Sequence, residues 1–192
     1  MGKVSGFAAV LFGLIGNVLA VGQAAESDLD IAFGGNPYPG ASSVLFDADG
    51  STLEDRGLLV AAQSTGYVMA GMVNTLAGGA DIGLTRLNGS GAVDTAFGAS
   101  GKRVIALDLV QAGIDMPTSQ AIDSQGRIVI GVQASNGAGL VPIVLRLTSN
   151  GNLDTSFDGD GIRQISDLSY NFFGGAEVAI GENDSVYVGV PA

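Results

Sequence analysis

Two stretches of the chain read almost alike: RLNGSGAVDTAFGASG at residues 86–101 and RLTSNGNLDTSFDGDG at residues 146–161. They lie 60 residues apart and share the pattern RL-x3-G-x-[VL]-D-T-[AS]-F-x3-G. Extended without a gap, the match joins residues 61–107 to 121–167, with 14 of 47 positions identical. A fixed period of this length indicates a repeat architecture, in which each unit is one supersecondary structure that stacks on its neighbours.

Partial copies flank the two full ones. Residues 29–34 (LDIAFG) match 93–98 (VDTAFG), and residues 186–190 (VYVGV) match 128–132 (IVIGV). We therefore expect a repeat domain over residues 25–192. Its parts are a partial N-terminal unit at 28–60, a first unit at 61–118, a second unit at 119–175 and a truncated unit at 176–192.

Each full unit reads as four short strands. Arg127–Gln133 (RIVIGVQ) is rich in β-branched residues, Leu140–Leu147 is apolar at nearly every position, and Asn150-Gly151 is a hairpin turn signal. Strands that are apolar on both faces belong to sheets covered on both sides, and a radial stack of four-stranded blades supplies that cover. We therefore predict an all-β fold of antiparallel four-stranded units in a β-propeller-like array, complete or incomplete. A β-solenoid is the alternative.

The 60-residue period and the LDTSF segment at Leu153–Phe157 resemble the delta-60 repeat of secreted bacterial proteins. The resemblance covers about residues 28–192 and implies a β-propeller-like fold. Members of that family generally carry more copies, and no catalytic residues come with the resemblance. This chain departs from the pattern at Asp158, where glycine is usual, and over Gly35–Leu59, which is poorly repeat-like.

Eight residues define the structural repeat: Arg86 and Arg146, Gly91 and Gly151, Asp94 and Asp154, Phe97 and Phe157. We expect the two aspartates to cap the turns after the glycines through Asx hydrogen bonds. The two phenylalanines are interpreted as wedges between neighbouring units, and the two arginines as partners of a carboxylate or of the turn backbone. A repeated catalytic carboxylate, an aromatic ligand platform and an anion clamp are the less favoured alternatives.

The first 24 residues have the three parts of a secretory signal. Lys3 begins it, Phe7–Val21 is an apolar run, and Gly22-Gln23-Ala24 places small residues where a signal peptidase reads them. The run is about 15 residues long, short of the roughly 20 that span a bilayer, so a signal is favoured over a transmembrane anchor. We expect cleavage after Ala24 and exclusion of the signal from the fold. The mature chain would then be secreted, periplasmic or part of the bacterial cell envelope.

The composition removes whole classes of chemistry. The chain has no Cys, no His and no Trp, which excludes thiolate nucleophiles, Ser-His-Asp triads and metal sites built from Cys or His. The net charge of −11 repels phosphate backbones and anionic membranes, so nucleic acid is not an expected partner. No catalytic residue is assigned.

Two Asp-rich turns are candidate metal sites. They contain Asp47 with Asp49, and Asp158 with Asp160, each pair separated by one residue and followed by glycine. Such oxygen donors suit Ca²⁺, the one cofactor that the sequence suggests. Neither turn completes an EF-hand pattern, and Asp-Gly pairs are also ordinary hairpin turns.

Together these features favour an exported non-enzymatic repeat protein that serves as an interaction or structural module at the bacterial envelope or surface. The alternatives are a propeller-type hydrolase, or a small-ligand or Ca²⁺-binding protein that uses carboxylates only, and a remnant of a longer repeat protein. The units are too few to close a propeller ring of four or more blades. The open repeat ends therefore predict self-association or docking of a protein partner.

Overall fold

The structure is a computed structural model of the chain, and it describes residues 9–12, 33–35, 38–39, 41–44, 46, 55–75, 79–166 and 175–190. Within these ranges all regular structure is β, apart from a three-residue 3-10 turn, η2, at Glu182–Asp184. The predicted all-β class is confirmed. No helix in the described ranges is long and apolar enough to cross a membrane.

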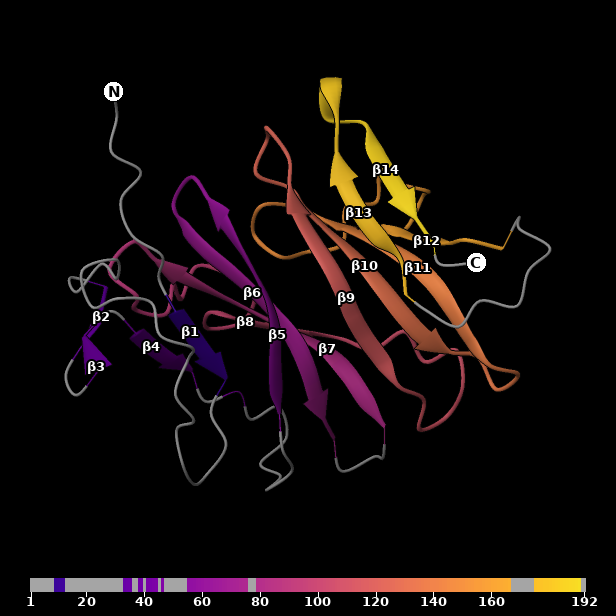
Figure 1. Ribbon diagram of the computed structural model, residues 1–192, viewed down its shortest axis with the longest axis horizontal. Helices are drawn as coiled ribbons and strands as arrows, with labels where there is room; N and C mark the ends of the chain where they lie inside the picture. Colours follow the sequence, from indigo (N-terminus) through magenta and orange to yellow (C-terminus); the bar gives the residue numbers. More distant parts are fainter. Residues whose placement is uncertain are drawn as a thin grey trace.

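Two four-stranded antiparallel sheets form the body of the molecule, and both follow the chain in order (Figure 1). Sheet one consists of β5 (Arg56–Gln63), β6 (Gly66–Asn74), β7 (Ala80–Asn88) and β8 (Lys102–Ile105). Sheet two consists of β9 (Asp115–Ile122), β10 (Ile128–Ser135), β11 (Leu140–Leu147) and β12 (Ile162–Gln164). These are the four-stranded units that the sequence predicts.

The first strand of each sheet begins earlier than the self-match of the sequence. β5 starts at Arg56, inside the stretch assigned to the partial N-terminal unit, and β9 starts at Asp115, inside the stretch assigned to the first unit. Backbone pairing defines a strand, and both strands pair with their hairpin partners over their whole lengths, apart from one register shift in each. The side chains of the first strands differ between the units, so sequence identity does not mark where they begin.

Shorter strands lie beyond both sheets. At the C-terminal end β13 (Glu177–Ile180) pairs with β14 (Val186–Gly189) in a two-stranded antiparallel sheet. At the N-terminal end lies a small sheet, and its strands are β1 (Ala9–Phe12), β2 (Gly34–Gly35), β3 (Tyr38–Pro39) and β4 (Ala41–Val44).

One strand of the small sheet comes from the predicted signal. β1 runs parallel to β4, so four residues of a segment that we expected outside the fold are paired in this sheet. Short apolar segments rich in β-branched and aromatic residues satisfy their backbone by adding to a sheet edge, and AVLF is such a segment. The predicted cleavage position, Ala24, lies outside the described residues.

The sheets stack face to face. The first strands of successive sheets are neighbours, because β9 contacts β5 on one side and β13 on the other (Figure 1). This is the arrangement of propeller blades around their inner strands. No sheet in the described part of the chain closes on itself.

Three apolar clusters fill the spaces between the layers. The largest lies between sheets one and two and includes Val68, Ile82 and Leu84 facing Ile130 and Leu145. A second covers the other face of sheet one with residues of the N-terminal segment, and a third lies between sheet two and β13–β14. Each of the two large sheets is thus covered on both faces, which explains why their central strands are apolar without alternation.

Candidate functional site

The recurring residues meet on the turn that follows the third strand of each sheet. In sheet one, Asp94 Oδ1 accepts a hydrogen bond from the N–H of Ala96 at 3.0 Å, and Oδ2 accepts one from Nε of Arg86 at 2.8 Å. The guanidinium carbon of Arg86 also lies 5.2 Å from the ring centroid of Phe97. The aspartate therefore forms an Asx turn with the residues that follow it and holds the arginine over the aromatic ring.

Sheet two repeats this arrangement. Asp154 accepts hydrogen bonds from the N–H of Ser156 at 3.1 Å and from Nε of Arg146 at 2.8 Å. The guanidinium carbon of Arg146 lies 4.8 Å from the ring centroid of Phe157. One addition is particular to sheet two, because the Ser156 hydroxyl bridges Asp154 and Arg146.

Phe97 connects sheet one to sheet two. Its side chain is fully buried, and its ring lies against Gly151, where a Cβ atom would come within 2.6 Å of the ring. Beside it the N–H of Gly98 donates to the carbonyl of Asn150 at 3.1 Å. Gly151 has φ +84°, so both its backbone conformation and the ring above it require glycine.

The same joint occurs once more, between the N-terminal segment and sheet one. Phe33 is buried, and one of its ring carbons lies 3.3 Å from the position of a Cβ atom at Gly91. The N–H of Gly34 donates to the carbonyl of Ser90 at 2.9 Å. Phe33-Gly34 therefore relates to the Gly91 turn as Phe97-Gly98 relates to the Gly151 turn. We call this contact of Phe, Gly and carbonyl the aromatic joint.

Beyond sheet two only half of the aromatic joint is present. Phe157 is partly buried and packs against the cluster that contains Val129, Val144 and Ala176. In the described residues no glycine turn lies against its ring, because the last unit there contains only β13 and β14.

Polar residues line the seam beside the aromatic joint of sheets one and two. Nη1 of Arg86 donates to the carbonyl of Ser149 at 2.8 Å and to Oε1 of Gln63 at 3.2 Å. Nε2 of Gln63 in turn donates to the carbonyl of Gly126 at 2.6 Å. A polar pocket of about 260 Å³ opens here, and its lining includes Gln63, Arg86, Asp94, Gln125, Ser149 and Asn150.

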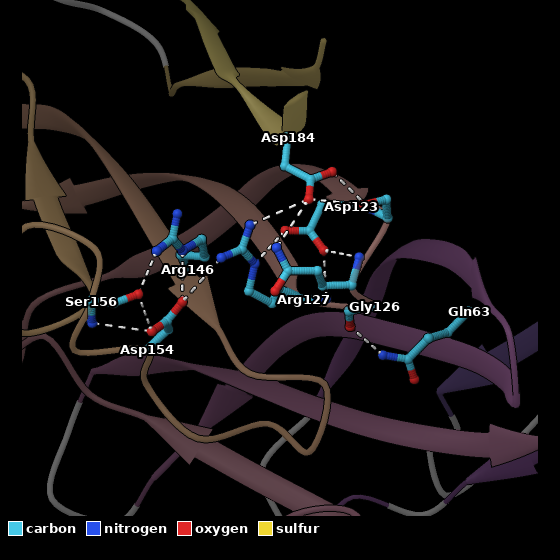
Figure 2. Close-up of polar contacts among 10 residues, drawn as sticks. Gln63, Asp123, Gly126, Arg127, Arg146, Asp154, Ser156 and Asp184 are labelled. Atoms are coloured by element: carbon cyan, nitrogen blue, oxygen red, sulfur yellow. Dashed lines mark hydrogen bonds and ion pairs between the residues drawn. The ribbon is translucent and has the colours of Figure 1, made fainter. Parts of the chain in front are cut away.

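The seam between sheet two and β13–β14 is ionic (Figure 2). Arg127 lies among three carboxylates: it hydrogen-bonds to Asp123, and it approaches Asp184 at 3.6 Å and Asp154 at 4.0 Å. Both Asp184 oxygens also accept hydrogen bonds from Ser124, one from its N–H at 2.9 Å and one from its hydroxyl at 2.8 Å. Asp184 therefore fastens the C-terminal hairpin to the first turn of sheet two. We call this network the ionic latch.

The carboxylates of both seams are held in their charged form. The N–H of Ala96 and the guanidinium of Arg86 lower the pKa of Asp94. Hydrogen bonds from Ser156, with Arg146, lower the pKa of Asp154. Hydrogen bonds from Ser124 lower the pKa of Asp184, with smaller contributions from Gln125 and Arg127. Groups with lowered pKa values are poor proton donors or acceptors near neutral pH.

Two other aspartates, Asp81 and Asp115, have raised pKa values instead. Burial raises the pKa of Asp115, and the nearby charges of Asp81 and Asp108 raise it further, although the N–H of Leu107 donates to its carboxylate at 2.8 Å. Burial, with the charge of Asp108, raises the pKa of Asp81. Asp81 and Asp115 lie where the start of β7 meets the start of β9, beside the bridge between Ala80 and Ile114.

The candidate metal ligands of the second Asp-rich turn are engaged within the chain. Asp158 pairs with Arg163 at 3.1 Å, and Asp160 accepts a hydrogen bond from the N–H of Ile162 at 2.8 Å. Among the described residues no three acidic side chains come close enough together to hold a metal ion. The other candidates, Asp47 and Asp49, lie outside the described residues.

Several residues of the seams were not singled out from the sequence. These residues are Gln63, Asp123, Arg127 and Asp184. The pattern does not mark them because they do not recur at the 60-residue spacing. Opposite charges at Asp123 and Arg127, on either side of a predicted turn, were an available signal for that pair. Nothing in the sequence brings Asp184 to the same place, because its partners lie about 60 positions away.

A comparison with known families gives one match. Residues 124–157, from the turn before β10 to Phe157, match a family described as a domain of unknown function (DUF5122) beta-propeller. The match supports a β-propeller-like repeat for this part of the chain. No curated protein and no solved structure has a significant match.

Proposed function

We propose that the chain is an exported, non-enzymatic repeat protein of the delta-60 type, which serves as an interaction or structural module at the bacterial envelope or surface. One observation carries the proposal: the charged residues that recur in the repeat pair with groups of the protein itself. Arg86 binds the aspartate of its own turn and a carbonyl of the next sheet, so the best-placed polar groups already have partners within the protein. The β-propeller match supports the repeat architecture.

Export is tested by expressing the chain with a C-terminal tag in a bacterial host and sequencing the N-terminus of the product. We expect a product that begins at Ala25 in the periplasmic, envelope or culture fraction. Replacing Leu11 by Arg interrupts the apolar run and should leave the uncut chain in the cytoplasm. An uncut wild-type chain in the cytoplasm would refute export. Because β1 lies in this signal, cleavage would also remove β1 from the small N-terminal sheet.

The role as an interaction module is tested with the exported product, which is incubated with envelope fractions of its own cell type and recovered by its tag. We expect retention of a protein partner that survives washing at high salt, because the aromatic joint is apolar and salt screens only charged contacts. Recovery of no partner and no self-association would count against this role.

A second candidate is the binding of a small polar ligand, and the polar pocket between sheets one and two favours it. A ligand there would compete with Gln63 and Ser149 for Arg86. A thermal-shift screen with sugars, carboxylates, phosphate and Ca²⁺ compares this candidate with the main proposal. A stabilisation that is lost in Arg86→Gln, or a Ca²⁺ effect that is reversed by chelator, would favour the ligand-binding alternative.

A further inference from the structure

We infer that Phe157 and the open edge of β14 together bind the third strand and glycine turn of a further copy of this repeat. The inference rests on the proposed role as an interaction module, and it specifies the partner. The partner is an apolar β-strand that ends in RL-x3-G, and no phenylalanine ring packs on its glycine. Three independent features of the edge support this occupant.

The first feature is the aromatic joint itself, which is complete at two places in the described residues. In both cases a phenylalanine packs on a glycine of the next unit, and the N–H after that phenylalanine donates to the carbonyl before that glycine. At the third position the phenylalanine is Phe157 and the following N–H is that of Asp158. In the part of the chain that the structure describes, neither has its counterpart, and Phe157 remains partly exposed.

The second feature is the arginine. Arg86 donates forward to the carbonyl of Ser149, two residues before the glycine that receives Phe97. Arg146 occupies the equivalent position, but the hydrogen bonds that it makes among the described residues stay within its own turn, to Asp154 and Ser156. A carbonyl two residues before an incoming glycine would give Arg146 the contact that Arg86 makes with Ser149.

The third feature is the strand edge. Val186–Gly189 matches Ile128–Gly131 in sequence, and in sheet two that segment pairs with β11, with Ile128 opposite Leu147 and Gly131 opposite Val144. No third strand pairs with β14 in the described ranges, and Tyr187 and Val188 are 62% and 39% exposed. An edge with unpaired N–H and C=O groups and apolar side chains accepts an added strand.

A second folded copy of this chain is a poorer occupant. Its two glycine turns are already filled, Gly91 by its own Phe33 and Gly151 by its own Phe97. A copy could offer a free glycine only by breaking an aromatic joint of its own. A repeat segment whose glycine has no phenylalanine against it meets no such cost.

The test uses a fluorescent 13-residue peptide with the sequence of residues 140–152, LVPIVLRLTSNGN, and the full chain. This peptide carries the strand, the carbonyls equivalent to those of Ser149 and Asn150, and the glycine. We expect saturable binding by fluorescence anisotropy, with the peptide in the register of β11 on β10. Replacing the peptide glycine by valine should weaken binding by about tenfold or more, since it places a side chain where the ring of Phe157 must lie.

Variants of the protein locate the site. Phe157→Ala and Val188→Lys should each weaken peptide binding by about tenfold or more, whereas Leu109→Ala, at an exposed apolar residue away from this edge, should leave it unchanged. Because Phe157→Ala could loosen sheet two, its unfolding midpoint is measured in parallel, and Val188→Lys provides the independent variant.

Three results would overturn the inference. One is the absence of saturable binding, and another is equal binding of the glycine and valine peptides. The third is a dimer of the chain that Phe157→Ala abolishes and the peptide does not dissociate, since the edge would then serve a second copy. The signal-cleavage and envelope-retention tests do not depend on this peptide, so its failure is distinguishable from failure of the proposed function.

Discussion

The joint between sheets one and two and the joint between sheet two and β13–β14 use the same recurring residues in different ways. In the first, Phe97 is fully buried on Gly151, and one arginine crosses to a carbonyl. In the second, Phe157 is only partly covered, and the ion pair of Asp184 with Arg127 adds to a small apolar cluster. A neighbour with its third strand in place supplies a glycine turn for the aromatic ring. A neighbour that provides two strands is held through its first hairpin instead.

The largest difference between the two joints should appear when each phenylalanine is removed. Phe97→Ala empties a buried site and should lower the free energy of unfolding by about 3–5 kcal/mol. Phe157→Ala should cost less, about 1–2 kcal/mol, since its ring keeps part of its contact with water. Urea unfolding at neutral pH measures both. Equal losses would show that the joint at Phe157 is as complete as the joint at Phe97.

The stability cost of replacing the glycine of the joint has two parts, backbone strain and collision of the new side chain with the ring. Gly151 and Gly159 have similar positive φ angles, +84° and +92°, but an added Cβ meets the ring of Phe97 at Gly151 and nothing within 4 Å at Gly159. Gly159→Ala should cost only the strain of the left-handed conformation, about 1–2 kcal/mol. Gly151→Ala should cost a further amount of about 1–3 kcal/mol for overpacking.

A double variant sharpens this result. In a Phe97→Ala background the ring is gone, so Gly151→Ala should cost no more than Gly159→Ala does in the wild type. The coupling free energy from the cycle then measures the contact of ring and glycine alone. Additive losses would mean that the ring does not limit the size of residue 151.

The ionic latch should act locally. Asp184→Asn removes the charge that faces Arg127 and weakens the acceptor of the two Ser124 hydrogen bonds. We expect faster amide exchange in β13 and β14, with sheet one unchanged, because only the C-terminal hairpin depends on this contact. Asp160→Asn is the matched control, since that carboxylate accepts a hydrogen bond within its own turn. Uniform loosening of all sheets would contradict a local role.

The smallest effect concerns the pH dependence of stability, in which two sets of aspartates should act in opposite directions. Asp115 and Asp81 have raised pKa values in the folded protein. Their contribution to stability is fully present below the ordinary value of 3.8 and is lost as the pH rises through the folded values. Asp94, Asp154 and Asp184 have lowered pKa values, so their contribution is present above 3.8 and is lost as the pH falls through the folded values.

Stability should therefore rise modestly as the pH falls from 7 toward about 4 and then decline in stronger acid. The midpoint of urea unfolding across this range measures both limbs. Asp115→Asn should flatten the rise without changing the acid decline, because it removes one group of the first set and none of the second. A profile that Asp115→Asn leaves unchanged would assign the rise to other groups.

Much of the fold could be predicted from the sequence because it depends on local patterns. The 60-residue self-match gave the period, and apolar strands separated by glycine turns gave four strands per unit. The sequence also marked Asp158 as an exception to the glycine of the pattern. In the structure Asp158 and its counterpart Gly98 have nearly equal positive φ angles, +51° and +53°. Aspartate is one of the few residues with a side chain that adopt this conformation readily.

The joints between units depend on the stacking of sheets and could not be derived in this way. Recurrence pointed to Phe97 and Gly151 separately, but only the packed sheets place the ring of one on the backbone of the other. Asp184 was overlooked because a lone aspartate in a turn is unremarkable until a sheet formed about 60 residues earlier lies beside it. Period and strand order follow from short-range chemistry. Which side chains meet across units is decided by the close packing of whole faces, where a single Cβ atom or charge determines the fit.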